Sequence, residues 1–475
     1  MQPTRRNKIG DRIVRRPRVR EVTPIVVRTP PRRHQTRLFS SPFMIPVSFA
    51  MLIIIGGGLL MLPISSASGQ ATSALVAFFT SCSAVTVTGL TLVDTGIYWS
   101  KFGQAVIFAL MGIGGLGFMT GATFVLILIG QRITLPERML MRETLLANRL
   151  GGLVKLTQYV VLTAFVIYLI GMALMYWRFQ SHYQGTEALW QAAFHSVSAF
   201  NNAGFSIVQG ASLSGYRTDH ILLAIFAVLI ILGGISYVVM VDVFRRLRFQ
   251  RFSLDTKLVL LVSLILWVAG ALVIFGSEYG NSETLGPLPV GGKLATGLFH
   301  SISARTAGFA TIDLGKAGDF TNLFIVALMF VGGAAGSTAG GIKVNAFAVL
   351  MVAVISSIRG RMHAEAFGRE IPHTQVHRAL AVAVLSMLFI SGVVLFFTLH
   401  EKDVPFIRLL FEAVSAFGTV GLSAGATTEL SSTGTLFLIF TMYVGRLGPL
   451  ALVLLWAPKE RQETYRFMQE RVRIG

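Results

Sequence analysis

The chain has 475 residues, of which 53% are apolar and only 13% are charged. Soluble domains carry about 25% charged residues, and several uncharged runs here exceed the roughly 20 residues that cross a bilayer as a helix. These values argue against an ordinary soluble enzyme and predict an all-α polytopic membrane protein. A cleaved secretory signal is not expected, and the single cysteine, Cys82, excludes an intramolecular disulfide.

The net charge of +19 is concentrated near the N-terminus. Residues 1–40 hold twelve Lys or Arg, two acidic residues and several prolines, which predicts a mostly disordered basic arm. A basic arm can bind nucleic acid. On a membrane protein it is more typical of a cytoplasmic segment that is attracted to anionic lipids. We therefore expect membrane lipids as its partner, and no nucleic acid.

Eight apolar segments follow the arm, at about 42–64, 103–130, 156–177, 219–244, 258–276, 321–357, 378–399 and 433–457. The gaps at 131–155, 245–257 and 358–378 are rich in Arg and Lys, and they alternate with gaps that are poor in both. Because basic loops stay in the cytoplasm, the pattern predicts eight transmembrane helices with both termini cytoplasmic.

Four of the less basic stretches share one pattern: AFFTSCSAVTVTGLTLVD at 77–94, AFHSVSAFNNAGFSIV at 193–208, LFHSISARTAGFATID at 298–313 and LFEAVSAFGTVGLSAG at 410–425. Each has a Ser-Ala pair and then a glycine followed by Leu or Phe. The glycines are Gly89, Gly204, Gly308 and Gly421, at intervals of 115, 104 and 113 residues. The third copy is one residue shorter between its Ser-Ala pair and its glycine. A motif that recurs at such a period indicates four copies of one structural unit.

The unit reads as helix, short half-helix, glycine loop, helix. The predicted organisation is a basic cytoplasmic arm at 1–40, repeat 1 at 41–130, repeat 2 at 131–250, repeat 3 at 251–357 with a broken second helix, repeat 4 at 358–457, and a cytoplasmic C-terminal segment at 458–475. The predicted fold is therefore four helix–pore loop–helix repeats around one pore.

Backbone that leaves a helix at membrane depth needs protein or a water-filled cavity to satisfy its N–H and C=O groups. Four such loops around one axis can present rings of backbone carbonyls that replace the hydration shell of a cation. Glycine suits this role because it adopts positive φ without a Cβ clash. The predicted filter residues, which include no carboxylate, are Thr86, Val87, Thr88, Gly89, Asn202, Ala203, Gly204, Thr306, Ala307, Gly308, Thr419, Val420 and Gly421.

These four motifs and the eight-span length closely resemble the Trk/Ktr/HKT superfamily of potassium transporters. The resemblance covers about residues 42–475 and is strongest to its KtrB branch, the membrane subunit of bacterial Ktr uptake systems. In that family a glycine in every filter loop accompanies K⁺ selectivity. The resemblance thus implies K⁺ uptake across a bacterial plasma membrane, often stimulated by Na⁺. It also implies a homodimer in which a C-terminal glycine, here Gly475, inserts at the interface.

A cytosolic regulatory ring subunit, KtrA-like, is the further partner that the resemblance implies. Such rings bind ATP or ADP, with cyclic di-AMP as an additional regulator. No nucleotide-binding domain is recognisable in this chain, so these ligands are expected on the partner and no cofactor is expected here.

The sixth apolar segment contains VGGAAGSTAGG at 331–341. Each glycine costs a helix about 1 kcal/mol relative to alanine, so the span should break there and place mobile backbone in the conduction path. The family resemblance implies an intramembrane gate at the same place. The predicted gate residues are Gly332, Gly333, Gly336, Ser337, Thr338, Gly340, Gly341 and Arg446.

Arg446 lies in the apolar run FLIFTMYVGRLGPLALVLLW of the last span. A charge at that depth is costly without a partner, which makes it a functional candidate. We expect it to set a barrier below the filter or to donate to carbonyls freed by the broken sixth helix, as the family's matching arginine is proposed to do. The alternative is a snorkelling side chain that anchors the helix end.

For several other sequence features we expect a structural role. GIGGLG at 112–117 resembles a nucleotide-binding pattern, but no strand precedes it, so helix packing is expected. His195, His300 and Glu412 should bond locally, and Arg305 should tie its loop to its surroundings. Asp94 and Asp313 could concentrate cations at the outer mouth.

Two rival functions stay open. A secondary transporter of an organic solute should show inverted repeats and a midplane binding site, whereas these four repeats share one orientation. A membrane-embedded enzyme would need a catalytic set of His, Asp or Glu within the spans, and the sequence offers none.

Overall fold

The computed structural model describes residues 44–117, 153–210 and 212–448. Several predicted segments lie outside these ranges: the arm at 1–40, the second half of the span at 103–130, most of the basic gap at 131–155, the end of the last span at 433–457, and the C-terminal segment 458–475 with Gly475. All four glycine stretches lie within the described residues.

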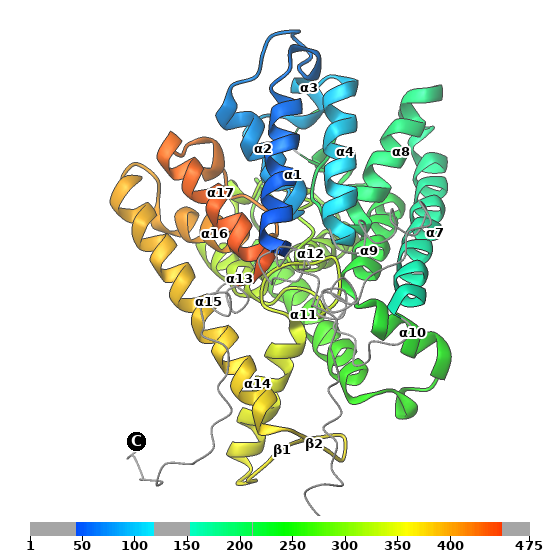
Figure 1. The fold of residues 1–475 in the computed structure, drawn as a ribbon, viewed down its shortest axis with the longest axis vertical. Helices are drawn as coiled ribbons and strands as arrows, with labels where there is room; N and C mark the ends of the chain where they lie inside the picture. The colour runs from blue at the N-terminus through cyan, green and yellow to red at the C-terminus, as the bar shows by residue number, and fades with distance from the viewer. Residues whose placement is uncertain (1–43, 118–152, 211, 449–475) are drawn as a thin grey trace, which may run out of the picture.

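The helices recur in one order: a first helix, a short central helix, and a second helix (Figure 1). Repeat 1 has α1 (Met44–Leu60), α2 (Ala74–Thr86) and α4 (Lys101–Leu116), with α3 (Thr95–Tyr98) before α4; repeat 2 has α7 (Leu153–Phe179), α8 (Gly185–Phe200), α9 (His220–Gly234) and α10 (Tyr237–Arg246); repeat 3 has α11 (Leu254–Glu278), α12 (Val290–Ser303), α13 (Asp319–Phe330) and α14 (Val344–Ile358); repeat 4 has α15 (His373–His400), α16 (Phe406–Gly418) and α17 (Ser432–Leu447). Helices α2, α8, α12 and α16 are called the central helices below.

The helices have the apolar length that a membrane protein requires. Three described segments, Thr157–Phe179, Leu254–Glu278 and His373–His400, are each long and apolar enough to cross a bilayer, and α9 with α10 counts as a fourth. Their outward faces expose large apolar side chains such as Leu264, which is 56% exposed, and Leu395, which is 65% exposed. These helices and their repeated order confirm the predicted class of polytopic helical membrane protein.

The apolar segment predicted at 219–244 is not one straight helix, because α9 and α10 meet at a bend of 100°. Gly233 and Gly234 end α9, Ile235 is extended, and the Ser236 hydroxyl caps α10 by accepting from the Val238 amide at 3.2 Å. Carbonyl groups freed by this break accept hydrogen bonds from the segment between α13 and α14, including one from the Ala334 amide to Gly234 at 2.9 Å.

The central helices pack on the first helices through a contact that recurs in three repeats. In each, a central-helix serine donates to a carbonyl of the first helix and lies where the Cβ of a first-helix glycine would be. The pairs are Ser81 with Gly56, Ser196 with Gly171, and Ser301 with Gly270. This shared geometry indicates that the repeats are copies in packing as well as in sequence.

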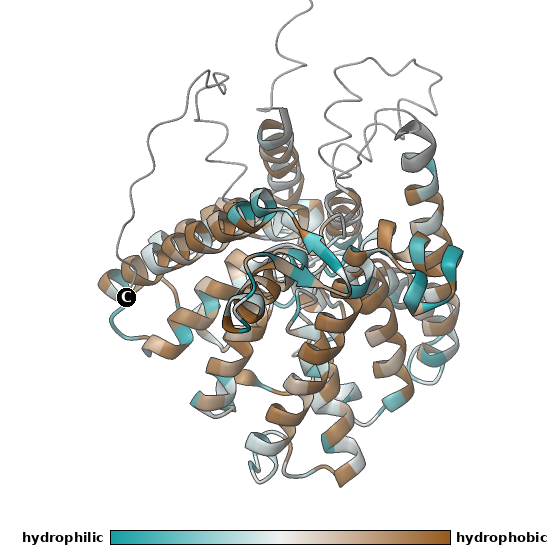
Figure 2. Ribbon diagram, turned by 90° about the horizontal axis from the view of Figure 1, so that it is seen from below, coloured by the Kyte–Doolittle hydropathy of each residue, from teal (hydrophilic) through white to brown (hydrophobic). Residues whose placement is uncertain are grey.

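The lower side of the molecule in Figure 1 carries a small antiparallel hairpin that the sequence did not predict. Strands β1 (Ala364–Ala366) and β2 (Arg369–Ile371) pair with Ala364 opposite Ile371. Its two turn residues, Phe367 and Gly368, both have positive φ, at 53° and 70°, as a type I′ turn requires. Figure 2, seen from below, shows hydrophilic residues gathered in this hairpin and hydrophobic residues along most helices.

Five single-turn 3₁₀ helices complete the described secondary structure, at Pro63–Ser65, Ser214–Tyr216, Phe249–Arg251, Leu314–Lys316 and Ala426–Thr428.

Candidate ion pathway

Each central helix ends in a loop whose backbone adopts two left-handed residues. The loops at 86–89, 201–204, 305–308 and 418–421 are called the glycine loops below. Their glycines have φ of 91°, 72°, 76° and 89°, and the residue two positions earlier also has positive φ: Val87, Asn202, Thr306 and Thr419. Val87, Thr306 and Thr419 have β-branched side chains, for which this conformation costs on the order of 1–2 kcal/mol. Such strain at three of the four matched positions is typical of functional sites.

The four glycines form a closed ring. A Cβ built on Gly89 would lie 2.8 Å from the Cα of Gly204, and the corresponding distances run 3.2 Å to Gly308, 3.2 Å to Gly421 and 3.1 Å back to Gly89. Each such Cβ would also meet the carbonyl oxygen of the residue before the next glycine. The structure therefore brings all four glycine loops, and with them every predicted filter residue, around one axis.

The serine of each Ser-Ala pair holds the glycine loop that follows it. Three serines donate to the carbonyl of the residue after the glycine: Ser198 to Phe205 at 2.7 Å, Ser303 to Phe309 at 2.6 Å and Ser415 to Leu422 at 2.6 Å. In repeat 1 the Ser83 hydroxyl instead accepts from the Gly89 amide at 3.0 Å. The sequence showed these serines four times but not their partners, because the partners follow from the path of the loop.

The shorter third copy is accommodated at the end of its central helix. In the other repeats the helix continues two or three residues beyond the serine, and a 2.8 Å bond joins the serine carbonyl to the amide five residues on. Helix α12 ends at Ser303 itself. The Ser303 carbonyl accepts from the amide four residues on, at Ala307, at 2.9 Å, and its bond from the amide five residues on, at Gly308, is longer, at 3.4 Å. The missing residue therefore shortens the turn and leaves Gly308 in the ring.

A vestibule of about 490 Å³ opens on one side of the ring. All four ring glycines line it, as do Asp94 and Asp313. Both carboxylates also cap short helices: Asp94 accepts from the Gly96 amide at 2.9 Å, and Asp313 from the Gly315 amide at 2.9 Å. Asp94 and Asp313 thus stabilise short helices and also place negative charge at the wall of the vestibule.

The segment at 331–343 leaves the helix and folds beneath the ring; it is called the 331–343 loop below. Its two ends are joined, because the Gly332 amide donates to Ile342 O at 2.9 Å. Its other face touches the glycine loops: a Cβ on Gly332 would lie 3.2 Å from the Thr306 methyl, and one on Gly341 would lie 3.2 Å from Gly418 Cα. A Cβ on Gly340 would overlap the Thr419 hydroxyl.

The remaining predicted gate residues lie in the same loop. Gly333 packs against the Ala339 side chain, Gly336 has φ of 79°, Ser337 is half-buried, and the Thr338 hydroxyl donates to Gly233 O at 2.9 Å. Lys343, which was not among the predicted gate residues, donates to Ala339 O.

Arg446 joins three separate parts of the fold. From α17 it donates through Nη1 to Thr338 O and through Nη2 to Gly114 O, each at 2.5 Å. Thr338 belongs to the 331–343 loop, and Gly114 lies in the last turn of α4, where its carbonyl also accepts from the Gly117 amide at 3.3 Å. The side chain therefore turns into the protein and ties the loop to α4, which disfavours the snorkelling alternative.

Buried polar groups beside the glycine loops bond locally, as predicted. His195 Nε2 lies 3.0 Å from the Ser206 hydroxyl, and His300 Nε2 lies 3.0 Å from the Thr311 hydroxyl. Glu412 accepts from Thr427 at 2.7 Å and also from Ser423. Each pair joins a central helix to the chain just after its ring glycine.

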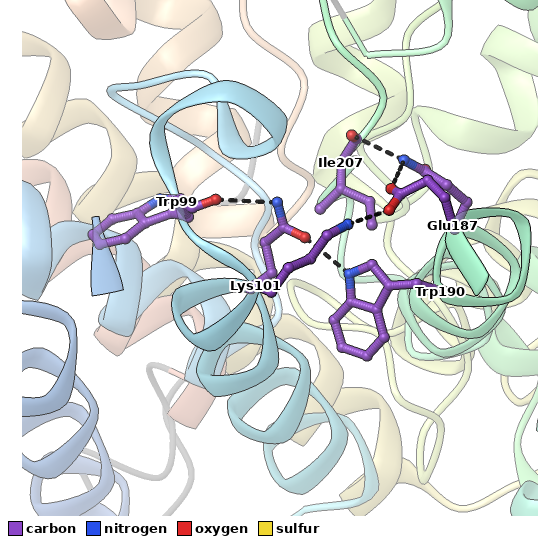
Figure 3. Close-up of polar contacts among 7 residues, drawn as sticks. Trp99, Lys101, Glu187, Trp190 and Ile207 are labelled. Atoms are coloured by element: carbon purple, nitrogen blue, oxygen red, sulfur yellow. Dashed lines mark hydrogen bonds and ion pairs between the residues drawn. The ribbon is translucent and has the colours of Figure 1, made fainter. Parts of the chain in front are cut away.

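Polar contacts also join α4 of repeat 1 to α8 of repeat 2 (Figure 3). Lys101 Nζ lies 2.6 Å from Glu187, and Trp190 donates to the Gln104 side chain at 2.8 Å. The Gln191 amide donates to Ile207 O at 3.4 Å, three residues beyond the ring glycine of repeat 2. Lys101, Gln104, Glu187, Gln191 and Ile207 line a second pocket between these repeats, separate from the vestibule.

Two glycines of GIGGLG, Gly114 and Gly115, serve packing as predicted, whereas nothing lies within 4 Å of the Cβ position of Gly112. A Cβ on Gly114 would overlap Val85 O of the neighbouring central helix, and one on Gly115 would overlap the Asn201 side chain. In the described ranges, no group of three His, Cys, Asp or Glu residues is arranged to hold a metal ion.

The family model of TrkH, a cation transport protein, matches residues 27–465. The chain belongs to the TrkH family of cation transport proteins. It is therefore a multi-pass membrane transporter and not an enzyme, which confirms both predictions.

Curated relatives match this TrkH-family chain over nearly all of its length. The Ktr system potassium uptake protein B of Bacillus subtilis is 40% identical over 437 residues, or 92% of this chain and 97% of that protein. The potassium/sodium uptake protein NtpJ of Enterococcus hirae is 35% identical over 440 residues, or 91% and 96%. These matches confirm the predicted Trk/Ktr membership and its KtrB branch.

A solved structure has the same fold at low sequence identity. The potassium transporter TrkH from Vibrio parahaemolyticus matches with a TM-score of 0.69 and 18% identity, over 90% of this chain and 86% of that chain.

Proposed function

We propose that this TrkH-family transporter moves K⁺ across the plasma membrane through a selectivity filter made by the four glycine loops. The observation that carries the proposal is the closed ring of Gly89, Gly204, Gly308 and Gly421. A ring of uncharged backbone suits a weak, multi-site path, in which a dehydrated ion exchanges water for carbonyl oxygens. The carbonyls of Thr86–Gly89 and of the three matching loops are the proposed ligands.

The proposed gate is the 331–343 loop together with Arg446. This proposal is supported by the position of the loop. The loop lies directly against Thr306, Gly418 and Thr419, on the side of the ring opposite the vestibule. The loop stays in place through hydrogen bonds to Gly233, Gly234 and Arg446, so breaking a few bonds would free it. A broken helix inside a span commonly supplies such a mobile segment.

The choice of K⁺ rests on the functions of the similar proteins. The Bacillus subtilis protein is a potassium uptake protein, and the Enterococcus hirae protein is a potassium/sodium uptake protein. Four glycines in the four loops add support from the family pattern. We propose that Na⁺ stimulates uptake, and that Na⁺ is not the main cargo.

The proposed assembly follows the Ktr systems to which the chain is similar. It consists of a homodimer of this chain with a KtrA-like cytosolic ring that binds ATP or ADP and cyclic di-AMP. Both termini are proposed to be cytoplasmic, since arginines gather in the gap between α10 and α11 and in the gap around the β1–β2 hairpin.

The alternative is a secondary transporter of an organic solute. Such a protein needs a midplane site with room for its substrate. The ring glycines lie too close together for an organic solute to pass between them, so the geometry favours a single-file path for ions.

Growth of bacteria at limiting K⁺ tests the proposed function. In a strain without K⁺ uptake systems, the chain with a Ktr-type ring subunit should restore growth at K⁺ concentrations where the vector alone does not. Failure to grow, with the protein present in the membrane, would contradict K⁺ uptake. Restored transport of an amino acid or sugar instead would support the alternative.

Ser415→Ala should loosen the proposed filter. The change removes the bond to Leu422 O and the bond from the Gly421 amide at 3.2 Å, and it leaves buried groups unpaired. Each unpaired group costs about 1–3 kcal/mol, so both the unfolding temperature and the K⁺-to-Na⁺ flux ratio should fall. The control is Ser386→Ala, another buried serine of repeat 4, which bonds only Val382 O within its own helix. Equal flux ratios in the two variants would contradict the role.

A further inference from the structure

Arg305 carries the only charge in the four glycine loops. It precedes Gly308 by three residues, where the other loops have Thr86, Asn201 and Gly418. Its side chain is buried, with 4% of the residue exposed. Across residues 44–117, 153–210 and 212–448, no carboxylate lies within ion-pair distance of it. A buried cation without a carboxylate needs other strong partners.

The partners of Arg305 are backbone carbonyls at the start of the 331–343 loop. Nη2 donates to Gly332 O at 2.9 Å, and Nε donates to Val331 O at 3.3 Å. A third bond, from Nη1 to Ser263 O of α11, is 3.5 Å long, and the guanidinium carbon lies 5.5 Å from the Trp267 ring centre. Helix α11 therefore holds the guanidinium on one side through Nη1. On the other side, Nε and Nη2 donate to the consecutive carbonyls of Val331 and Gly332.

Those two carbonyls belong to the hinge of the loop. Val331 is the first residue after α13, and it forms a parallel bridge with Ile342 at the other end of the loop. The next bonds, from the Gly332 amide to Ile342 O and from the Val344 amide to Gly333 O, complete the closure. A shift of Val331 and Gly332 would therefore move both ends of the loop together.

The backbone of Arg305 is fixed next to the ring. The Arg305 amide donates to Ile302 O at 3.2 Å. The next residue, Thr306, has the strained left-handed backbone that precedes Gly308 in the same loop. No residue separates this strained turn from the guanidinium that holds the hinge.

We propose that Arg305 is a positioning residue that couples cation occupancy of the third glycine loop to the hinge of the 331–343 loop. The proposal rests on the proposed function. An ion held by the carbonyls of the ring fixes the 305–308 backbone, and the guanidinium then holds Val331 and Gly332 in place. When no ion occupies the ring, the backbone turn at Thr306 relaxes. The guanidinium then no longer faces the Val331 and Gly332 carbonyls, these hydrogen bonds break, and the 331–343 loop is released. Lysine cannot replace Arg305 in this role, because an ammonium lacks the planar set of N–H donors that reaches two carbonyls at once.

A thiol reporter on the loop tests the coupling. Cys82 is the single native cysteine, so Cys82→Ala combined with Ala335→Cys leaves one thiol, at a half-buried position of the 331–343 loop. The reaction rate with a small thiol reagent is measured on the purified full chain, in K⁺ and in choline at equal ionic strength. We expect a rate difference of at least about fivefold between the two salts, the lower end of typical couplings between sites.

Arg305→Gln should bring this ratio close to one, and Arg305→Lys should reduce it, although lysine keeps the charge. Arg408→Gln is the matched control. It removes an arginine that also donates to a backbone carbonyl, Gly315 O at 3.3 Å, far along the chain from the loop, and it should keep the full ratio. Arg305→Lys keeps the test decisive if the glutamine variant does not fold.

A full ratio in Arg305→Lys, or no salt dependence in the parent, would overturn the coupling. Either result together with selective K⁺ flux through the parent would leave the proposed function intact. A parent that conducts no cation would instead count against the proposed function.

Discussion

Arg446→Gln is expected to raise K⁺ flux about tenfold or more. Arginine holds the 331–343 loop to α4 through bonds to Thr338 O and Gly114 O. A hydrogen bond from a charged group contributes about 1.5–3 kcal/mol, and each 1.4 kcal/mol is roughly a factor of ten in an equilibrium constant. Glutamine is shorter, neutral and unable to bridge both carbonyls, so the loop should leave its place beneath the ring more often. The measurement is Rb⁺ or K⁺ uptake into liposomes.

The control for this variant is Arg178→Gln. That arginine pairs with Asp219 at 2.6 Å at the end of α7 and has no contact with the 331–343 loop. Its flux should match wild type. Unchanged flux kinetics in a well-expressed Arg446→Gln protein would remove Arg446 from the gate.

Gly89→Ser is expected to abolish discrimination between K⁺ and Na⁺. The glycine has φ of 91°, and a Cβ there would lie 2.5 Å from Ala203 O and 2.8 Å from Gly204 Cα. The left-handed backbone alone costs on the order of 1–2 kcal/mol for a residue with a side chain, and the overlap must also push the loop of repeat 2 away. A ring that opens on one side no longer fits a dehydrated K⁺. The ratio of K⁺ to Na⁺ flux in liposomes is the measurement.

Gly69→Ser is the control that separates the cost of the left-handed backbone from the cost of the steric overlap in Gly89→Ser. Gly69 has φ of 70°, but nothing lies within 4 Å of its Cβ position. The control therefore carries the backbone strain without the collision and lies outside the ring. Loss of selectivity in both variants would point to general destabilisation instead of a filter.

The architecture could be predicted largely because it is repeated. One glycine after one polar stretch means little, but four copies between apolar segments restrict the topology to four similar units. The Ser-Ala pair recurs with the glycine for the reason that the structure reveals: the serine hydroxyl fixes the loop that contains the glycine. The repeat was visible in the sequence, while its hydrogen bonds required the path of the chain.

Features without a repeat were harder to predict. Among the described residues, the 100° bend after Gly234 belongs to repeat 2, and there the apolar run conceals a break that Ser236 caps. The hairpin turn at Phe367 and Gly368 lacks the Asn-Gly pair that usually signals it. The partners of Arg446 and Arg305 come from α4, α11 and the 331–343 loop, and no local pattern connects segments so distant in sequence.

Flux of K⁺, Rb⁺ and Na⁺ into liposomes that hold the purified wild-type chain tests the central claim most directly. If the four glycine loops form the filter, K⁺ and Rb⁺ should enter well ahead of Na⁺, with or without the cytosolic ring subunit present. Equal entry of all three ions, or no entry even with that subunit added, would contradict a K⁺ filter built from the four loops.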